Sequence, residues 1–181
     1  GLVEVGVGLI PGGGGTKEFA LRLSDSFYQG DVQIPKLIEA CKTLAMASVA
    51  TSAHEAYNHG YLTKGRDFVV PNVSRNISEA KKKVLELAPT YTQPDKREAH
   101  VLGRTGLGAL YTVANYASEH DIKIAKKIAF VLCGGDLSGP QKVSEQYLLD
   151  IEREAFLSLC GEQKTLERIQ HMLQTNKPLR N

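Results

Sequence analysis

The sequence predicts a mainly α-helical protein with one or two short β segments near its beginning. Apolar residues recur every three or four positions over most of the 181 residues, which is the spacing of amphipathic helices. Ser residues that can cap helices, and Gly or Pro residues that end them, divide this pattern into separate segments. Short β-branched stretches occur mainly at the start of the chain, so we expect little sheet.

The first part of the chain is expected to contain two short extended segments and four helices. Residues 2–9 are β-branched and glycine-spaced, which indicates an extended or strand segment, and Phe68 to Pro71 should form a second extended piece. Helical spacing then follows the glycine cluster. The expected helices are residues 16–27, residues 36–49, a short helix that a capping box of Ser52 and Glu55 opens and Gly60 ends, and a helix from Ser78 to about residue 88 that Pro89 stops.

The second part should be entirely helical. Ser138 and Gln141 form a second capping box, which is expected to open a long helix. On the last helix, Leu166, Ile169 and Leu173 should face inward. The expected helices are residues 98–118, residues 121–133 with Gly134 and Gly135 as the C-cap, residues 138–159, and residues 162–174 before a tail.

Composition and charge exclude several classes of protein. The net charge of +2 gives no electrostatic argument for binding nucleic acid or a membrane. The chain has no apolar run of about 18 residues, and no signal peptide is visible. The three cysteines lie far apart without a CxxC pair, so we expect free thiols in a reducing compartment, the cytoplasm.

A cluster of glycines precedes the helix expected at residues 16–27. A P-loop would need Lys followed by Ser or Thr, but Thr16 precedes Lys17 here, and a dinucleotide fingerprint would need glycine where Pro11 stands. The cluster can still bring backbone close to a ligand, and unpaired amides at the helix start favour an anion or a polarised oxygen. The alternative is a tight strand-to-helix turn that binds nothing.

Glu4 is the only carboxylate in the apolar opening segment. Burying a carboxylate is costly unless it has a partner or a task, and burial raises its pKa toward the range that suits proton transfer. Glu4 is therefore a candidate acid or base. The alternative is an exposed glutamate on an edge strand.

These residues resemble the signature of the crotonase family, the enoyl-CoA hydratases and isomerases, written loosely as P-E-x-x-x-G-x-x-P-G-x-G-G-T. Val3 replaces the usual proline. Two later stretches, residues 52–71 and 152–178, also resemble the family, so the resemblance spans nearly the whole chain. Residues 124–149 resemble a narrower subgroup of the family. This subgroup consists of large bacterial proteins that fuse a 3-hydroxyacyl-CoA dehydrogenase to a C-terminal hydratase domain. The signature positions that match are Glu4, Gly8, Pro11, Gly12, Gly14, Gly15 and Thr16.

The resemblance implies the C-terminal part of a crotonase-like fold, with residues 1–75 as a partial core and residues 76–181 as a helical region. Family hydratases add water to a 2-enoyl-CoA between two glutamates, while two backbone amides bind the thioester oxygen. Glu4 resembles the second glutamate, and Gly12 resembles the glycine whose amide helps to hold the water. The first glutamate and the oxyanion donors lie upstream in the family, so this chain alone is expected to be a fragment without appreciable hydratase activity.

The resemblance also implies partners and ligands. The substrate would be an acyl-CoA thioester, with Lys177 and Arg180 as candidates to bind the CoA nucleotide, although a solvated tail is the alternative. NAD would belong only to an upstream dehydrogenase part, and the fragment itself should need no cofactor. No metal site is expected, because the five histidines lack metal-ligand spacing. The closing helices of the family pack subunits together, so a homo-oligomer is expected.

Two other functions remain open from the sequence. The chain could be a helical oligomerisation module without catalysis, which would associate through its apolar helix faces. It could also belong to an acyl-CoA isomerase or hydrolase on the same fold, because the upstream half decides among these activities.

Overall fold

The computed structural model describes residues 2–111 and 118–181, and the chain separates into two compact units. Unit 1 comprises Gly1–Val49 and Arg97–Asn181, and unit 2 comprises Ala50–Lys96. The described residues are mainly helical with one small antiparallel sheet, so the predicted fold class is confirmed at that level. The expected boundary after residue 75 falls inside unit 2, and the division into a partial crotonase core and a helical region stays a prediction.

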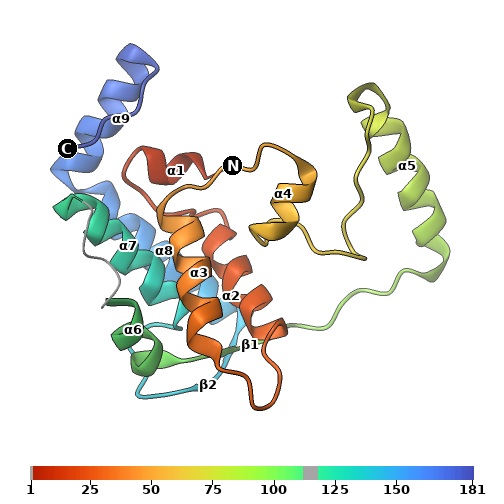
Figure 1. Cartoon of the computed structure of the whole chain (residues 1–181), viewed down its shortest axis with the longest axis horizontal. Coiled ribbons are helices and arrows are strands. Elements are labelled where there is room, and N and C mark those ends of the chain that lie inside the picture. The colour runs from red at the N-terminus through yellow and green to blue at the C-terminus, as the bar shows by residue number, and fades with distance from the viewer. Residues whose placement is uncertain (1, 112–117) are drawn as a thin grey trace. The chain divides into compact units, whose positions relative to one another are not determined.

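Four helices pack against one another to form the body of unit 1, as Figure 1 shows. Two further helices flank them: α6 (Gly103–Tyr111) packs on α3 and α7, and α9 (Gln163–Thr175) contacts α8. A single helical turn, α1 (Val3–Gly6), begins the unit. The four central helices are α2 (Gly15–Asp25), α3 (Gln33–Ala45), α7 (Glu119–Leu132) and α8 (Glu145–Cys160).

The core of unit 1 lies between these four helices. Leu21, Leu44, Ile128 and Leu148 each come from a different helix, and all four are fully buried. Removing such a side chain from water contributes about 1.5–3 kcal/mol, which helix propensity alone could not supply. The body of unit 1 is therefore stabilised by apolar side chains from all four helices.

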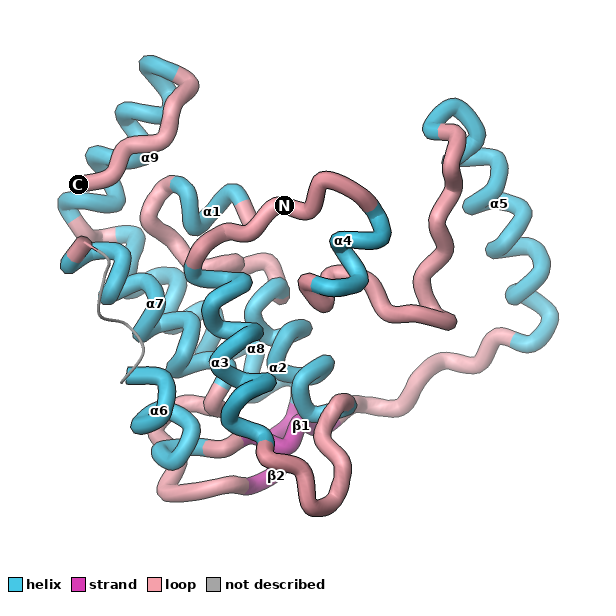
Figure 2. The backbone as a smooth tube through the Cα atoms, in the orientation of Figure 1, coloured by secondary structure: helices cyan, strands magenta, loops and turns pink. Residues whose placement is uncertain are grey.

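The small sheet joins β1 (Glu98–Val101) to β2 (Gln141–Ser144), drawn in magenta in Figure 2. The strands are antiparallel, with Glu98 opposite Ser144. Ala99 and Val101 on β1 are buried, and the His100 amide donates a 2.8 Å hydrogen bond to Ser24 Oγ of α2. The sheet is thus attached to the helical body through its first strand.

Unit 2 carries α4 (Ala53–Asn58), the 3₁₀ turn η1 (Val73–Arg75), α5 (Asn76–Leu87) and the 3₁₀ turn η2 (Ala88–Thr90). The Ser52 hydroxyl accepts the Glu55 amide at 3.1 Å, which confirms the predicted cap of α4. None of residues 50–96, all of which the structure describes, is buried. The unit therefore has no apolar core of its own.

Several predicted elements are wrong. Residues 2–9 do not form a strand; the Glu4 carbonyl accepts the amides of Val7 (3.1 Å) and Leu9 (2.9 Å), which curls the segment into α1 and a turn. Residues 98–101 form β1 instead of starting a helix, because they pair with β2. Residues 112–117 of the same predicted helix lie outside the described residues.

Two predicted caps are also wrong. Ser144, not Ser138, caps the long helix α8, accepting the Tyr147 amide at 3.2 Å, because β2 occupies the residues after Ser138. Ser78 lies inside α5, and the Asn72 side chain caps the 3₁₀ turn that leads into it. For α8, the pattern Ser-x-x-Gln predicted a helix start nearby, but the pairing of β2 with β1 moves the cap from Ser138 to Ser144.

The inward face predicted for α9 is wrong for Leu166 and Leu173, while the third predicted residue, Ile169, is half-buried. Leu166 and Leu173 are 49% and 82% exposed, whereas Thr165 and Arg168 are fully buried. The inward polar side chains form hydrogen bonds with other elements, described below, and those bonds set the rotation of the helix. Among residues 2–111 and 118–181, no helix combines the length and apolarity that crossing a lipid bilayer requires.

Candidate functional site

Glu4, the predicted acid, lies on α1 with its residue half-buried. One carboxylate oxygen, Oε2, is buried, and within the described part of the chain it has no hydrogen-bond partner. The neighbouring Val5 is 2% exposed, and the Glu4 carbonyl is bonded to the Leu9 amide. The backbone around Glu4 is therefore fixed, while an oxygen that prefers a donor is left without one.

The glycine cluster forms a turn between Pro11 and α2. Gly14 has φ +91°, a conformation that favours glycine. Thr16 is fully buried and its hydroxyl donates to the Pro11 carbonyl at 3.0 Å, closing the turn. Gly12 packs on the ring of Phe156, where a Cβ atom would come within 2.3 Å of Cδ2. Glycine at positions 12 and 14 is thus required by space and by backbone conformation.

The predicted unpaired amides at the start of α2 are largely occupied. The Glu152 carboxylate of α8 accepts the Gly14 amide through Oε1 and the Lys17 amide through Oε2, both at 2.7 Å. Glu152 is only 1% exposed. The expectation that this helix start is open to an anion is therefore wrong for these two amides. The Gly12 amide, by contrast, makes no hydrogen bond within the described residues.

Sequence reasoning missed Glu152, although a signal was present. The residue lies on the buried stripe of α8, four positions after Leu148 and three before Ala155. A carboxylate at that spacing must find partners inside the protein. Burial raises the pKa of Glu152, while the hydrogen bonds from the Lys17 and Gly14 amides act to lower it.

A buried polar network ties the segment after Glu4 to two helices. Thr165 Oγ1 of α9 donates to the Gly8 carbonyl at 2.9 Å and lies 2.9 Å from His120 Nε2 of α7. Since the hydroxyl has one proton, the imidazole must donate from Nε2, which assigns its tautomer. Burial, and then the nearby Arg168 guanidinium, lower the pKa of His120, so the ring is neutral near pH 7.

The structure places the two predicted CoA-binding residues near the C-terminal tail. Arg180 donates to Asp121 Oδ1 at 3.1 Å, and the buried Arg168 donates to the same oxygen at 2.7 Å. Burial acts to raise the pKa of Asp121, but the hydrogen bonds from Arg168 and Ser118 lower it overall. Lys177 is exposed, and its one hydrogen bond to the described residues is from its backbone amide to Thr175 Oγ1. The tail thus keeps Arg180 on the protein and leaves Lys177 in solvent.

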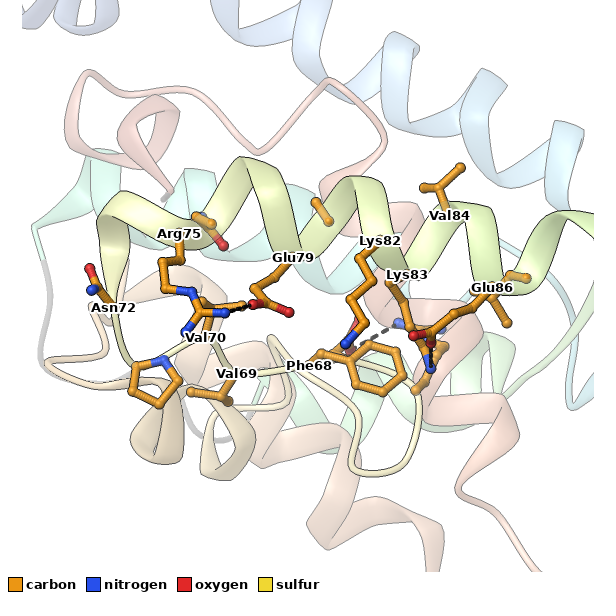
Figure 3. Close-up of a pocket in the computed structure, with 16 residues that line it drawn as sticks. Phe68, Val69, Val70, Asn72, Arg75, Glu79, Lys82, Lys83, Val84 and Glu86 are labelled. Atoms are coloured by element: carbon orange, nitrogen blue, oxygen red, sulfur yellow. Dashed lines mark hydrogen bonds and ion pairs between the residues drawn. The ribbon is translucent and has the colours of Figure 1, made fainter.

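Unit 2 contains a separate groove of about 760 Å³ between the extended residues 68–71 and α5, drawn in Figure 3. Phe68 lies under the Lys83 ammonium, 4.6 Å from the ring centroid. Lys83 also pairs with Glu86 at 3.1 Å, and Arg75 pairs with Glu79 at 2.5 Å. The charges along the groove are therefore largely matched, and we assign no chemistry to it.

The cysteines are free thiols, as predicted. Burial raises the pKa of Cys41 and of Cys133 to about 12, so neither forms a reactive thiolate near neutral pH. Among the described residues, no group of three or more His, Cys, Asp or Glu side chains could hold a metal ion.

Comparison with known proteins gives one finding that bears on function. The chain is 44% identical over 188 aligned positions to a protein of Bacillus subtilis (strain 168) named "Probable 3-hydroxyacyl-CoA dehydrogenase". No family model matches the chain, and no solved structure matches it. The alignment covers the whole of this chain and 23% of that relative. The chain is therefore similar to about a quarter of a much longer protein, and that protein is named a probable 3-hydroxyacyl-CoA dehydrogenase.

Proposed function

We propose that this chain is the C-terminal part of an enoyl-CoA hydratase domain within a fatty-acid β-oxidation enzyme. The intact protein would also carry an NAD-dependent 3-hydroxyacyl-CoA dehydrogenase part and would work in the cytoplasm. The name of the Bacillus relative, and its far greater length, support the dehydrogenase connection. The crotonase-like motif from Glu4 to Thr16 supports the hydratase activity.

One observation carries this proposal: the buried, unpartnered Oε2 of Glu4. Leaving a carboxylate oxygen without a donor costs about 1–3 kcal/mol or more. A bound water would remove that cost and would supply the nucleophile of a hydration reaction. The Gly12 amide has no partner among the described residues, and we propose it as a second donor to this water on the strength of the crotonase-like motif.

In the proposed reaction, water adds across the 2,3 double bond of a 2-enoyl-CoA. The water oxygen bonds to C3, electrons of the double bond move toward the thioester carbonyl, and a proton reaches C2. Glu4 would hold the water and exchange a proton, and the Gly12 amide would orient the water oxygen. A second glutamate and the donors that stabilise the thioester oxygen would come from a segment that precedes Gly1.

The CoA nucleotide would lie near the tail. Lys177 is exposed and available to a phosphate, whereas Arg180 would have to share its guanidinium with Asp121. Both residues remain candidates, with Lys177 the better placed.

Turnover of a short trans-2-enoyl thioester, crotonyl-CoA, tests the proposal. Two polypeptides are compared: this chain alone, and the chain preceded by the residues encoded upstream of Gly1. We expect hydration by the longer polypeptide and none by the chain alone. Normal turnover by the chain alone would contradict the proposal that part of the site comes from residues upstream of Gly1. An absence of turnover by the longer polypeptide would contradict the hydratase proposal. Formation of a shifted double bond or of free CoA would indicate an isomerase or a hydrolase.

A second function is favoured by a different observation. Leu166 and Leu173 on α9 are exposed, as are Ile77 and Val84 on α5, and such apolar surface marks association sites. The chain would then be a homo-oligomerisation module without catalysis. Sizing by light scattering tests this, because a module of this kind gives a mass above that of one chain at micromolar concentration.

A further inference from the structure

The Glu152 carboxylate connects two parts of unit 1 that are far apart in the sequence. It lies 138 residues after Gly14 and 135 residues after Lys17, yet it accepts both backbone amides at 2.7 Å. These amides belong to the last residue of the glycine turn and to the first turn of α2. A single side chain of α8 therefore fixes the point at which the turn enters the helix.

The next turn of α8 contacts the same segment. Phe156 follows Glu152 by four positions, so both side chains lie on one face of the helix. The Phe156 ring fills the space where a side chain at position 12 would lie. Glu152 thus holds the end of the glycine turn, and Phe156 packs against its beginning at Gly12.

The charges around Glu152 show why its bonds are directed to the backbone. The Lys17 ammonium pairs with Glu145 at 2.8 Å and with Glu18 at 3.5 Å, so it is occupied by two other carboxylates. Glu152 itself is 1% exposed, and a carboxylate so buried requires strong donors. The amides at the positive end of α2 meet that need, and they do so only while the turn keeps its present conformation.

We propose that Glu152 is a positioning residue of the hydratase site. It does not touch the substrate. It holds the turn from Pro11 to Gly14 so that the Gly12 amide can donate to the water that Glu4 also binds. This inference rests on the proposed function, because it assigns Glu152 a task within that site.

Glu152→Gln tests the proposal with little change in volume. The glutamine side chain has one acceptor oxygen, so it can keep one of the two amide bonds, and its NH₂ group faces the other amide. Glu154→Gln is the matched control: the same chemical change two positions further along α8, at an exposed side chain with no described partner.

The measurement is kcat and KM for crotonyl-CoA in the polypeptide extended upstream of Gly1, expressed per folded molecule from circular dichroism. We expect Glu152→Gln to lower kcat at least tenfold with KM changed less than twofold, and Glu154→Gln to match the wild type. In the 181-residue chain, NMR should show faster amide exchange at Gly14 and Lys17 and a shifted Gly12 resonance in Glu152→Gln. A purely structural cap would lower the folded fraction but leave kcat per folded molecule unchanged, and that result would overturn the proposal.

The outcomes separate this inference from the proposed function. If the wild-type extended polypeptide does not hydrate crotonyl-CoA, the proposed function fails and the positioning role fails with it. If the wild type is active and Glu152→Gln keeps its kcat, only the positioning role is overturned. If Glu152→Gln does not fold, Glu152→Asp gives the same test, because its shorter carboxylate keeps the charge but cannot reach both amides.

Discussion

Thr165→Val should destabilise unit 1 by far more than a surface substitution. The Thr165 hydroxyl is fully buried, accepts from His120 Nε2 and donates to the Gly8 carbonyl, each at 2.9 Å. Valine keeps the shape but removes the hydroxyl, which leaves two buried polar groups without a partner. Each such group costs about 1–3 kcal/mol, so we expect a loss of roughly 2–4 kcal/mol in the free energy of unfolding.

Urea unfolding followed by far-UV circular dichroism measures this loss. Thr165→Ser is the matched control, because it keeps the hydroxyl and removes one methyl group, at a cost of about 1 kcal/mol. The difference between the two variants isolates the hydrogen bonds. An ordinary surface substitution changes the free energy of unfolding by about 0.5 kcal/mol or less. If the free energies of unfolding of Thr165→Val and Thr165→Ser differ by no more than that, the reasoning is refuted.

Two further predictions concern the pH dependence and the association of the chain. His120 has a folded-state pKa below its usual 6.5, so its contribution to stability is complete above pH 6.5 and is lost as the pH falls through the folded value. The free energy of unfolding of the wild type should therefore be lower at pH 5.5 than at pH 7.5, and His120→Gln should reduce this difference. An equal difference in the two proteins would contradict the prediction. The double variant Leu166→Gln, Leu173→Gln should lower any concentration-dependent mass in light scattering, because these two leucines are the exposed apolar residues of α9. The control Lys164→Gln should leave the mass unchanged. An unchanged mass in the double variant would show that this stripe is not the contact.

Local signals in the sequence predicted the helices well. The apolar spacing of α3 and α8 identifies faces that are buried in the core, because burial of such faces is what stabilises helices. The Ser52 cap depends on atoms three residues apart, so it too can be predicted locally. The sheet could not be predicted in this way, since β1 and β2 are separated by about forty residues and each is four residues long.

In the candidate site, too, local features could be predicted from the sequence and contacts between distant residues could not. Glycine spacing predicted a turn before α2, which is present with Gly14 at φ +91°. Glu4 has one buried oxygen, as its apolar neighbours suggested, but its role as an acid or base stays a prediction. The role of Glu152 and the outward rotation of α9 were missed, because their partners come from the opposite end of the chain. Apolar periodicity predicts that apolar residues face the core. It cannot show that the buried side chains of Thr165 and Arg168 find hydrogen-bond partners in other parts of the chain.

The central claim is that the Glu4 carboxylate moves a proton for a water-addition reaction, and Glu4→Gln tests it most directly. The measurement is kcat for crotonyl-CoA hydration by the polypeptide extended upstream of Gly1, with the exposed Glu39→Gln of α3 as the control. The account predicts a fall of about 10²–10⁴-fold for Glu4→Gln, as for loss of a general acid or base, and wild-type turnover for the control. Wild-type turnover by folded Glu4→Gln would contradict it.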